Sequence, residues 1–295
     1  MNVAILGCGY AGRILARRLV ERGNPVRATT TTETRLSSLA ALGAEPLLVR
    51  TDRPESLGRL MKDVDAVVYL APPGQNQDPS ALAQSLAAAC PSGLQSFVYG
   101  STTGVFGKQT DSDAWVDEST PPRDPHEQGE LRLGVERALA ATGLPLKIVR
   151  IAGIYGPGRT LRDALRKDQL ILFQGGPPTS RIHVEDLARI LEAMIPKAAP
   201  PLVVACDEEP AETLTVARYT AELLHIQAPE PISLEDAKRI MSPRALEMRL
   251  GGHRCRSLVR QKLIGELEFP TYREGVRASL IAEGSLPEER LTPRA

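Results

Sequence analysis

Short apolar runs alternate with segments of mixed polarity along the first half of the chain. The apolar runs are too short for helices and predict buried strands at residues 2–6, 25–30, 45–49, 65–70, 95–100 and 146–151. The segments between them predict helices at 13–22, 54–61, 78–90 and 127–142. Such alternation is typical of an α/β fold with a doubly wound parallel sheet. Ligands of these sheets lie beyond the carboxyl ends of the strands, so the loops there are the expected place of a functional site.

The first strand runs directly into an unbroken G-x-G-x-x-G turn at residues 7–12, and a helix follows it. In this context Gly7 allows the tight turn, Gly9 lets the backbone approach a pyrophosphate, and Gly12 lets the helix pack on the strand. The free N–H groups and the helix dipole then favour phosphates. We therefore predict a dinucleotide site, although a glycine-rich turn that binds nothing would look similar. Its predicted contacts are Gly7, Gly9, Tyr10, Ala11, Gly12 and Arg13.

Four threonines, at 29–32, cross the carboxyl end of the second predicted strand. An acidic residue there would bind the ribose 2′-hydroxyl of NAD, whereas a basic group suits the 2′-phosphate of NADP. No acidic residue stands at the strand end, and Arg35 follows it, so NADP is favoured over NAD. The alternative is that the threonines form only a polar turn and helix cap. Further cofactor contacts are expected from Thr30, Thr31, Ala71, Pro72, Ile151 and Gly153.

The pattern changes after Gly158. A helix ending near Met194 and a strand at 201–206 are predicted there, with helices at 161–167, 213–224, 257–267 and 272–283 and a mostly helical segment at 234–248. We predict that residues 1–158 form most of a dinucleotide-binding Rossmann domain, and that 159–285 form a smaller α/β lobe covering the carboxyl edge of its sheet. Residues 286–295, rich in Glu, Pro and Arg, are expected to be a frayed tail.

Composition narrows the class of protein. The 36 basic and 36 acidic side chains balance, and aromatic residues make up only 4%, which argues against nucleic-acid and membrane partners. The four cysteines are far apart and form no C-x-x-C, so reduced thiols are expected rather than disulfides or a metal site. No charged leader with an apolar core is found, and no apolar run approaches bilayer length. We expect a cytoplasmic protein with a small-molecule substrate.

Several motifs accompany the glycine turn, at residues 101–107, 115–118, 150–158, 181–186 and 270–275. Together they resemble the short-chain dehydrogenase/reductase superfamily, in its atypical or extended branch of NAD-dependent epimerase/dehydratase type. The resemblance covers nearly the whole chain. It implies an NAD(P)-binding oxidoreductase or epimerase-like enzyme acting on a sugar nucleotide or a small carbonyl compound.

Catalysis in that family uses a Ser or Thr after the fifth strand and a Tyr-x-x-x-Lys pair on the next helix. The resemblance places Thr102 at the first position, Gln128 at the tyrosine and Arg132 at the lysine. A carboxamide does not titrate, and arginine is no neutral substitute for lysine, so the proton must come from elsewhere. His126 is the nearest titratable candidate, although a solvated loop histidine is the simpler interpretation. A catalytically silent NADP(H)-binding sensor or regulatory protein is therefore the alternative function.

The resemblance also suggests a substrate pocket near Thr103 and Phe106, where the family usually has a tyrosine in place of the phenylalanine. Arg159 and Arg181 would grip an anionic substrate, or they are ordinary solvated charges. His183 would touch substrate, or it satisfies loop backbone where the lobe meets the sheet. Family members often dimerise through the helices expected here at 78–90 and 127–142, so a homodimer is possible, but the same small residues would suit packing on the chain's own sheet.

Overall fold

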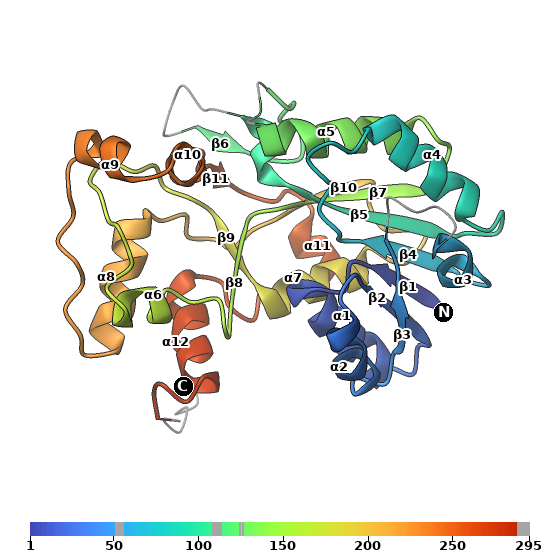
Figure 1. Ribbon diagram of the computed structural model, residues 1–295, viewed down its shortest axis with the longest axis horizontal. Helices are drawn as coiled ribbons and strands as arrows, with labels where there is room; N and C mark the ends of the chain where they lie inside the picture. The colour runs from blue at the N-terminus through green and yellow to red at the C-terminus, as the bar shows by residue number, and fades with distance from the viewer. Residues whose placement is uncertain (51–55, 108–113, 124, 126, 288–295) are drawn as a thin grey trace.

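The computed structural model describes residues 1–50, 56–107, 114–123, 125 and 127–287. Its centre is a seven-stranded parallel sheet in the order β10-β7-β5-β4-β1-β2-β3. All six strands expected in the first half are present, which confirms the doubly wound α/β fold (Figure 1). The strands are β1 (Val3–Leu6), β2 (Val26–Thr30), β3 (Glu45–Leu48), β4 (Ala66–Tyr69), β5 (Ser96–Thr102), β7 (Leu146–Ile151) and β10 (Leu202–Ala205).

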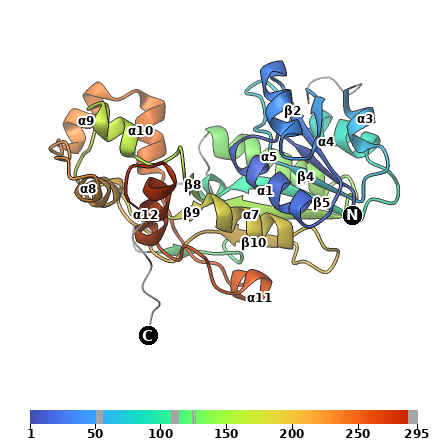
Figure 2. The same ribbon diagram turned by 90° about the horizontal axis from the view of Figure 1, so that it is seen from below.

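Helices cover both faces of this sheet (Figures 1 and 2). One face packs against α1 (Tyr10–Glu21), α2 (Leu36–Ala40), α7 (Val184–Ala193) and α11 (Arg260–Ile264). The other packs against α3 (Leu57–Met61), α4 (Pro79–Ala89) and α5 (Glu127–Ala140). Each interface is a buried apolar cluster, as strands with unbroken apolar sequences require. The homodimer expected through α4 and α5 stays a prediction.

The strand order reverses between β1 and β4. β1 pairs with β2 on one side and with β4 on the other, and the chain reaches β4 only after completing β2 and β3. In doubly wound sheets, ligands bind in the crevice at the carboxyl ends of two such strands. The glycine turn follows β1 at this point, and Ala71 follows β4.

A second, smaller part of the molecule lies at the carboxyl edge of the sheet (Figure 1). Two short parallel strand pairs, β8 (Gly153–Tyr155) with β9 (Arg181–His183) and β6 (Trp115–Val116) with β11 (Arg254–Cys255), form sheets separate from the main one. Its helices are α6 (Arg162–Arg166), α8 (Thr213–Leu223), α9 (Leu234–Ile240), α10 (Pro243–Leu250) and α12 (Tyr272–Ala282).

The boundary predicted after Gly158 does not coincide with the edge of the main sheet. β10 pairs with β7, and α7 packs against α1, so residues 184–205 return to the sheet after the first lobe segment. Treating 159–285 as one unit stays a prediction. Within the predicted tail, Leu286 packs on the apolar cluster around Tyr272, and residues 288–295 lie outside the described part of the chain.

The segment expected to be mostly helical at 234–248 is so, in two helices, because Ser242 caps a new helix whose first residue is Pro243. One predicted helix is wrong in length for a local reason. The helix expected at 257–267 shrinks to α11. The Ser257 hydroxyl caps the Arg260 N–H at 3.1 Å, and Gly265, with a φ of 70°, ends the helix. In the described residues, no helix is both long and apolar enough to cross a membrane.

Candidate functional site

The glycine turn is fixed between β1, β2 and β4. Gly7 has a φ of 88°, which favours glycine, and a Cβ there would lie 2.4 Å from the Ala71 nitrogen. The Gly7 N–H donates to Thr29 Oγ1 at 2.9 Å, and the Cys8 N–H donates to the Thr29 carbonyl at 2.8 Å. Thr29, which the sequence analysis treated only as part of the threonine run, thus holds the turn against β2.

The remaining two glycines leave the start of α1 close to the strand and open on one side. A Cβ on Gly12 would lie 3.3 Å from the Gly7 carbonyl oxygen and 3.4 Å from Ile5, so the helix packs tightly on β1. A Cβ on Gly9 would meet nothing within 4 Å, and no side chain caps α1. The first N–H groups of a helix have no partner inside it. An open backbone beside these groups is the arrangement that suits a diphosphate.

Tyr10, inside the turn, joins the cofactor side of the molecule to the lobe. Its hydroxyl donates to the Pro157 carbonyl at 2.9 Å, and the Arg159 guanidinium lies 4.5 Å from the centre of its ring. Burial raises the pKa of Tyr10 to about 12, so the phenol stays a hydrogen-bond donor. The Gly158 N–H donates to Glu283 beyond α12 at 2.6 Å. Tyr10 and Arg159, expected to bind different ligands, therefore contact each other.

Ser38 connects the Arg13 side chain of α1 to the backbone of Arg35, which follows the end of β2. Arg13 Nη1 donates to Ser38 Oγ at 2.7 Å, and the Ser38 hydroxyl donates to the Arg35 carbonyl at 2.8 Å. The Arg35 side chain is exposed, as is Thr31. Thr30 is buried, and its hydroxyl accepts from the Thr32 N–H at 3.1 Å, so it has a local turn role. Ser38 was not among the predicted site residues. The only hint in the sequence was its position, three residues after Arg35 in the segment that follows the threonines.

The other predicted cofactor residues come from neighbouring strand ends. Ala71 is half-buried beside Gly7 in the crevice between β1 and β4, and Pro72 after it is exposed. Ile151 ends β7 in register with Thr102 of β5, and Gly153 begins β8 with its surface exposed. The expected contacts thus come from the ends of β1, β4 and β7, which with β5 are consecutive strands of the sheet.

Thr102 ends β5 and caps the 3₁₀ turn at 103–106. Its Oγ1 accepts from the Gly104 N–H at 3.1 Å, which leaves the hydroxyl hydrogen available to donate. This turn packs on the start of α5, because a Cβ on Gly129 would lie 2.4 Å from the Gly104 oxygen. Gly129, which the sequence analysis did not single out, therefore sets Gln128 beside the loop of Thr102. Gln128 is exposed, and His126 lies outside the described residues.

Arg132 is held by the backbone of β5. Its Nη1 donates to the Gly100 carbonyl at 2.7 Å, and the side chain is half-buried. Two tyrosines, Tyr69 and Tyr99, lie near this charge with their rings 5.4 Å apart, and both are fully buried. Burial raises the pKa of each phenol, for Tyr99 to about 12, and the Arg132 charge opposes that rise. With no exposed surface, neither tyrosine can take the place that Gln128 holds.

Two of the expected substrate residues are engaged inside the protein. Phe106 is 3% exposed, with the Arg150 guanidinium 5.1 Å from its ring centre, whereas Thr103 is half-buried. Arg181 Nη1 donates to the carbonyls of Thr179 and Ala211, at 2.7 and 2.8 Å. Arg181 therefore supports loop backbone, and Arg159 is the exposed member of the predicted pair.

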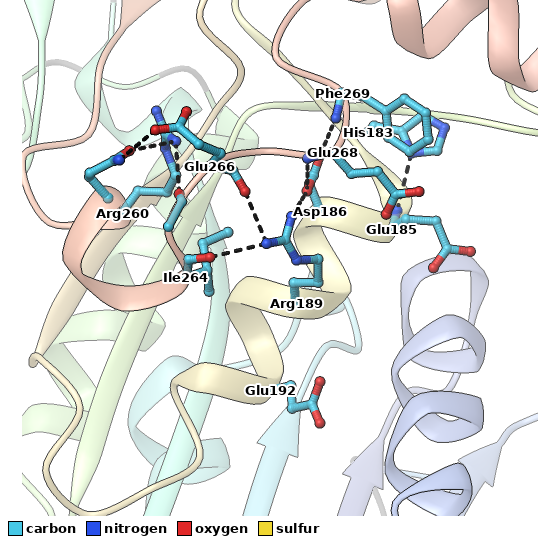
Figure 3. Close-up of polar contacts among 12 residues, drawn as sticks. His183, Glu185, Asp186, Arg189, Glu192, Arg260, Ile264, Glu266, Glu268 and Phe269 are labelled. Atoms are coloured by element: carbon cyan, nitrogen blue, oxygen red, sulfur yellow. Dashed lines mark hydrogen bonds and ion pairs between the residues drawn. The ribbon is translucent and has the colours of Figure 1, made fainter. Parts of the chain in front are cut away.

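His183 and Asp186 attach the lobe to α7 (Figure 3). His183 Nδ1 accepts from the Glu185 N–H at 3.3 Å, which leaves Nε2 to donate to Ser279 of α12 at 3.2 Å. Burial lowers the pKa of His183 to about 4, so the ring is neutral. Asp186 accepts from the N–H groups of Glu268 and Phe269, at 2.9 and 2.8 Å. The motif at 181–186 thus bonds backbone at the junction through Asp186, and a substrate contact by His183 stays a prediction.

Comparisons with known proteins agree with this geometry. The sequence profile of the family described as NAD(P)H-binding matches residues 7–197. Protein YeeZ of Escherichia coli K12 is 31% identical over 170 residues, which cover 54% of this chain and 60% of that protein, less than two thirds of its length.

Two solved structures have the same overall fold. A functionally unknown conserved protein from Silicibacter pomeroyi DSS is 31% identical with a TM-score of 0.84, over 95% of this chain and 98% of that one. MoeE5, solved in complex with UDP-glucose and NAD, is 20% identical with a TM-score of 0.74, over 95% of this chain and 98% of that one. The chain therefore belongs to the NAD(P)H-binding family, and it shares its fold with the Silicibacter pomeroyi protein and with MoeE5.

Proposed function

We propose that the chain is an NADP-preferring oxidoreductase or epimerase-like enzyme that acts on a sugar nucleotide or a small carbonyl compound. The observation that carries this proposal is the turn between β1 and α1, which is open at Gly9 and lies where the strand order reverses. Gly7, Gly9 and the first turn of α1 would hold the diphosphate. A bound nicotinamide supplies hydride transfer.

The preference for NADP rests on the charges beyond β2. Arg13 and Arg35 are both attached to Ser38, one through its side chain and the other through its carbonyl. No carboxylate occupies residues 26–32, the position from which an acidic side chain would bind the 2′-hydroxyl of NAD. Two guanidinium groups at one strand end suit a phosphate better than a diol.

Substrate binding and proton transfer are assigned to the loops after β5 and β7. The Thr102 hydroxyl would orient a substrate oxygen, since its hydrogen is available to donate. The exposed guanidinium of Arg159 would bind an anionic group such as a nucleoside diphosphate. This assignment follows the sugar nucleotide bound by MoeE5, a protein of the same fold. His126 is the proposed proton donor in place of Gln128.

The alternative is a catalytically silent protein that binds NADP(H) and signals its presence. Two observations favour this alternative. Gln128 cannot exchange a proton with a substrate, and the Arg132 guanidinium is already hydrogen-bonded to the Gly100 carbonyl of the protein itself. Both functions share the same cofactor site, so cofactor binding alone does not separate them.

Turnover separates the two functions. Purified protein would be incubated with NADPH and a panel of aldehydes and ketones, and separately with NADP⁺ and UDP- or dTDP-sugars. Nicotinamide absorbance would be followed and, for epimerisation, the sugar products would be separated by chromatography. We expect turnover that falls by at least about tenfold in Thr102→Ala. The control is Thr142→Ala, which removes a hydroxyl bonded to the Leu139 carbonyl at the end of α5. Tight NADPH binding without turnover over the whole panel would contradict the enzyme and favour the sensor.

A further inference from the structure

Tyr10 makes a side-chain contact that the glycine turn itself does not require. It is the first residue of α1, and its hydroxyl donates to the Pro157 carbonyl, 147 residues along the chain, at 2.9 Å. Gly156 makes room for this contact, because a Cβ there would lie 2.6 Å from the Tyr10 hydroxyl oxygen and 2.8 Å from Val184. The φ of Gly156, 149°, also favours glycine. The loop after β8 is therefore shaped to accept the Tyr10 side chain.

The ring of Tyr10 supports the Arg159 guanidinium. The guanidinium carbon lies 4.5 Å from the ring centre, within the range of a cation–π contact. The Arg159 N–H donates to the Gly156 carbonyl at 2.8 Å, so the backbone turns tightly just before this side chain. Arg159 is exposed, and its side chain makes no hydrogen bond or ion pair with the described residues. Its orientation thus depends on Tyr10, and the guanidinium stays available to an anion.

The lobe holds the other side of the same loop. The Gly158 N–H donates to Glu283, the residue after α12, at 2.6 Å. Glu283 Oε2 also pairs with Arg162 of α6 at 2.8 Å, and the glutamate side chain is only 7% exposed. The loop at 156–159 is therefore attached to the glycine turn through Tyr10 and to the lobe through Glu283.

The backbone of Tyr10 belongs to the proposed cofactor site. Its N–H lies in the first turn of α1, where no side chain caps the helix. A diphosphate bound there would fix this turn, and with it the base of the Tyr10 side chain. A ligand that rigidifies a protein lowers the ordering cost of a second ligand, which gives positive cooperativity. A bound cofactor should therefore favour an anion at Arg159.

We propose that Tyr10 is a positioning residue that couples two ligands, so that a bound nicotinamide cofactor strengthens the binding of a nucleoside diphosphate at Arg159. The inference rests on the proposed function, which places the cofactor diphosphate at the glycine turn and the anionic substrate group at Arg159. It adds that the two sites do not act independently. By linkage, the nucleoside diphosphate strengthens cofactor binding by the same factor.

Isothermal titration calorimetry measures this coupling directly. The full-length protein would be titrated with NADPH alone, and then with UDP or dTDP in the absence of NADPH and in its saturating presence. We expect UDP or dTDP to bind the NADPH-saturated protein at least about fivefold more tightly, a factor in the usual range for two coupled sites. The ratio of the two affinities should fall to about one in Tyr10→Leu, because leucine can neither bond to Pro157 nor stack under Arg159. The ratio is measured at saturation, so a change in NADPH affinity itself does not enter it.

Tyr219→Leu is the matched control. Tyr219 of α8 also lies under a guanidinium, that of Arg273 at 5.4 Å, and its hydroxyl donates to the Arg273 carbonyl at 3.1 Å. It belongs to the lobe and not to the glycine turn, so this variant should keep the ratio of the parent protein. Tyr10→Phe keeps the ring under Arg159 and loses only the bond to Pro157, so its ratio should lie above that of Tyr10→Leu.

The outcomes separate this inference from the proposed function. Equal nucleotide affinity with and without NADPH, no binding of UDP or dTDP, or displacement of either nucleotide by NADPH would overturn the coupling. So would a ratio in Tyr10→Leu as high as in the parent protein. In each of these cases NADPH binding would leave the proposed function standing. Absence of NADPH binding in the parent protein would instead overturn the proposed function, and the coupling with it.

Discussion

The turn after β1 and the start of α5 differ in how far each keeps the family pattern. The turn has all three glycines, the tight approach at Gly7 and the open face at Gly9. The start of α5 has the expected place beside the Thr102 loop, but Gln128 replaces the tyrosine and Arg132 is bonded to Gly100. Holding a diphosphate depends mainly on backbone shape, whereas proton transfer needs a titratable side chain. A chain can therefore lose the second without losing the fold.

Packing explains why the two regions are constrained differently. A side chain on Gly7 would collide with the backbone after β4, and one on Gly12 would press on β1. The fold alone thus requires these two glycines. Gln128 is exposed, so exchanging it costs little stability. Gly9 is different from both, because a Cβ there would meet nothing within 4 Å, so packing does not account for this glycine.

Gly9→Asp tests the turn after β1, and we expect it to have the largest effect of these variants, a loss of NADPH binding. The new carboxylate stands where the diphosphate is proposed, and two unit charges 4 Å apart repel by about 4 kcal/mol near a protein surface. We expect NADPH affinity to fall by at least about a hundredfold, measured by isothermal titration calorimetry.

The control for this variant is Gly93→Asp, which adds the same charge at another glycine whose Cβ would meet nothing within 4 Å. Its NADPH affinity and the melting temperatures of both variants should match those of the parent protein. Unchanged NADPH binding in Gly9→Asp would show that the turn does not hold the diphosphate, and would contradict the proposed function.

Gln128→Tyr tests the start of α5, because it restores a phenol where the resemblance places the catalytic tyrosine. The position is exposed in the first turn of α5 and adjoins the Thr102 loop, so a phenol can be accommodated there. General acid–base catalysis typically contributes about 10²–10⁴ in rate, and we expect NADPH turnover on a reactive carbonyl to rise by at least about tenfold. Glu130→Tyr, on another face of α5, should not change turnover. A turnover unaffected by Gln128→Tyr, with NADPH still bound, would show that a missing phenol is not what limits the reaction.

The sequence predicted the parts of the molecule that depend on local pattern. Six strands and the glycine turn follow from apolar runs and glycine spacing, and each is where it was expected, although β3 at the edge of the sheet is largely exposed and not buried as predicted. The pattern also predicted the strand at 201–206, but not that it would pair with β7 in the main sheet. Periodicity shows which residues are buried and carries no information about the element against which they pack.

The predicted site shows the same limit at the level of side chains. Arg159 and Arg181 look alike in the sequence, yet one is exposed over Tyr10 and the other binds two carbonyls. His183 was open to two interpretations, and its contact with Ser279 comes from a helix 96 residues away. Long-range contacts decide which polar residues are available to a ligand.

Arg35→Ala tests the finest part of the comparison, the choice between two cofactors that share one diphosphate site. Arg35 is exposed beyond β2 and makes no ion pair with the described residues, so its loss should leave stability unchanged. A charge-assisted hydrogen bond to a 2′-phosphate is worth about 1.5–3 kcal/mol, so NADPH affinity should fall by at least about tenfold while NADH affinity stays constant. The control is Arg137→Ala, which removes an exposed arginine that lies in α5, and it should change neither NADPH nor NADH affinity. Equal losses for NADPH and NADH in Arg35→Ala would mean that Arg35 does not bind the 2′-phosphate, and the preference for NADP would then depend on Arg13 alone.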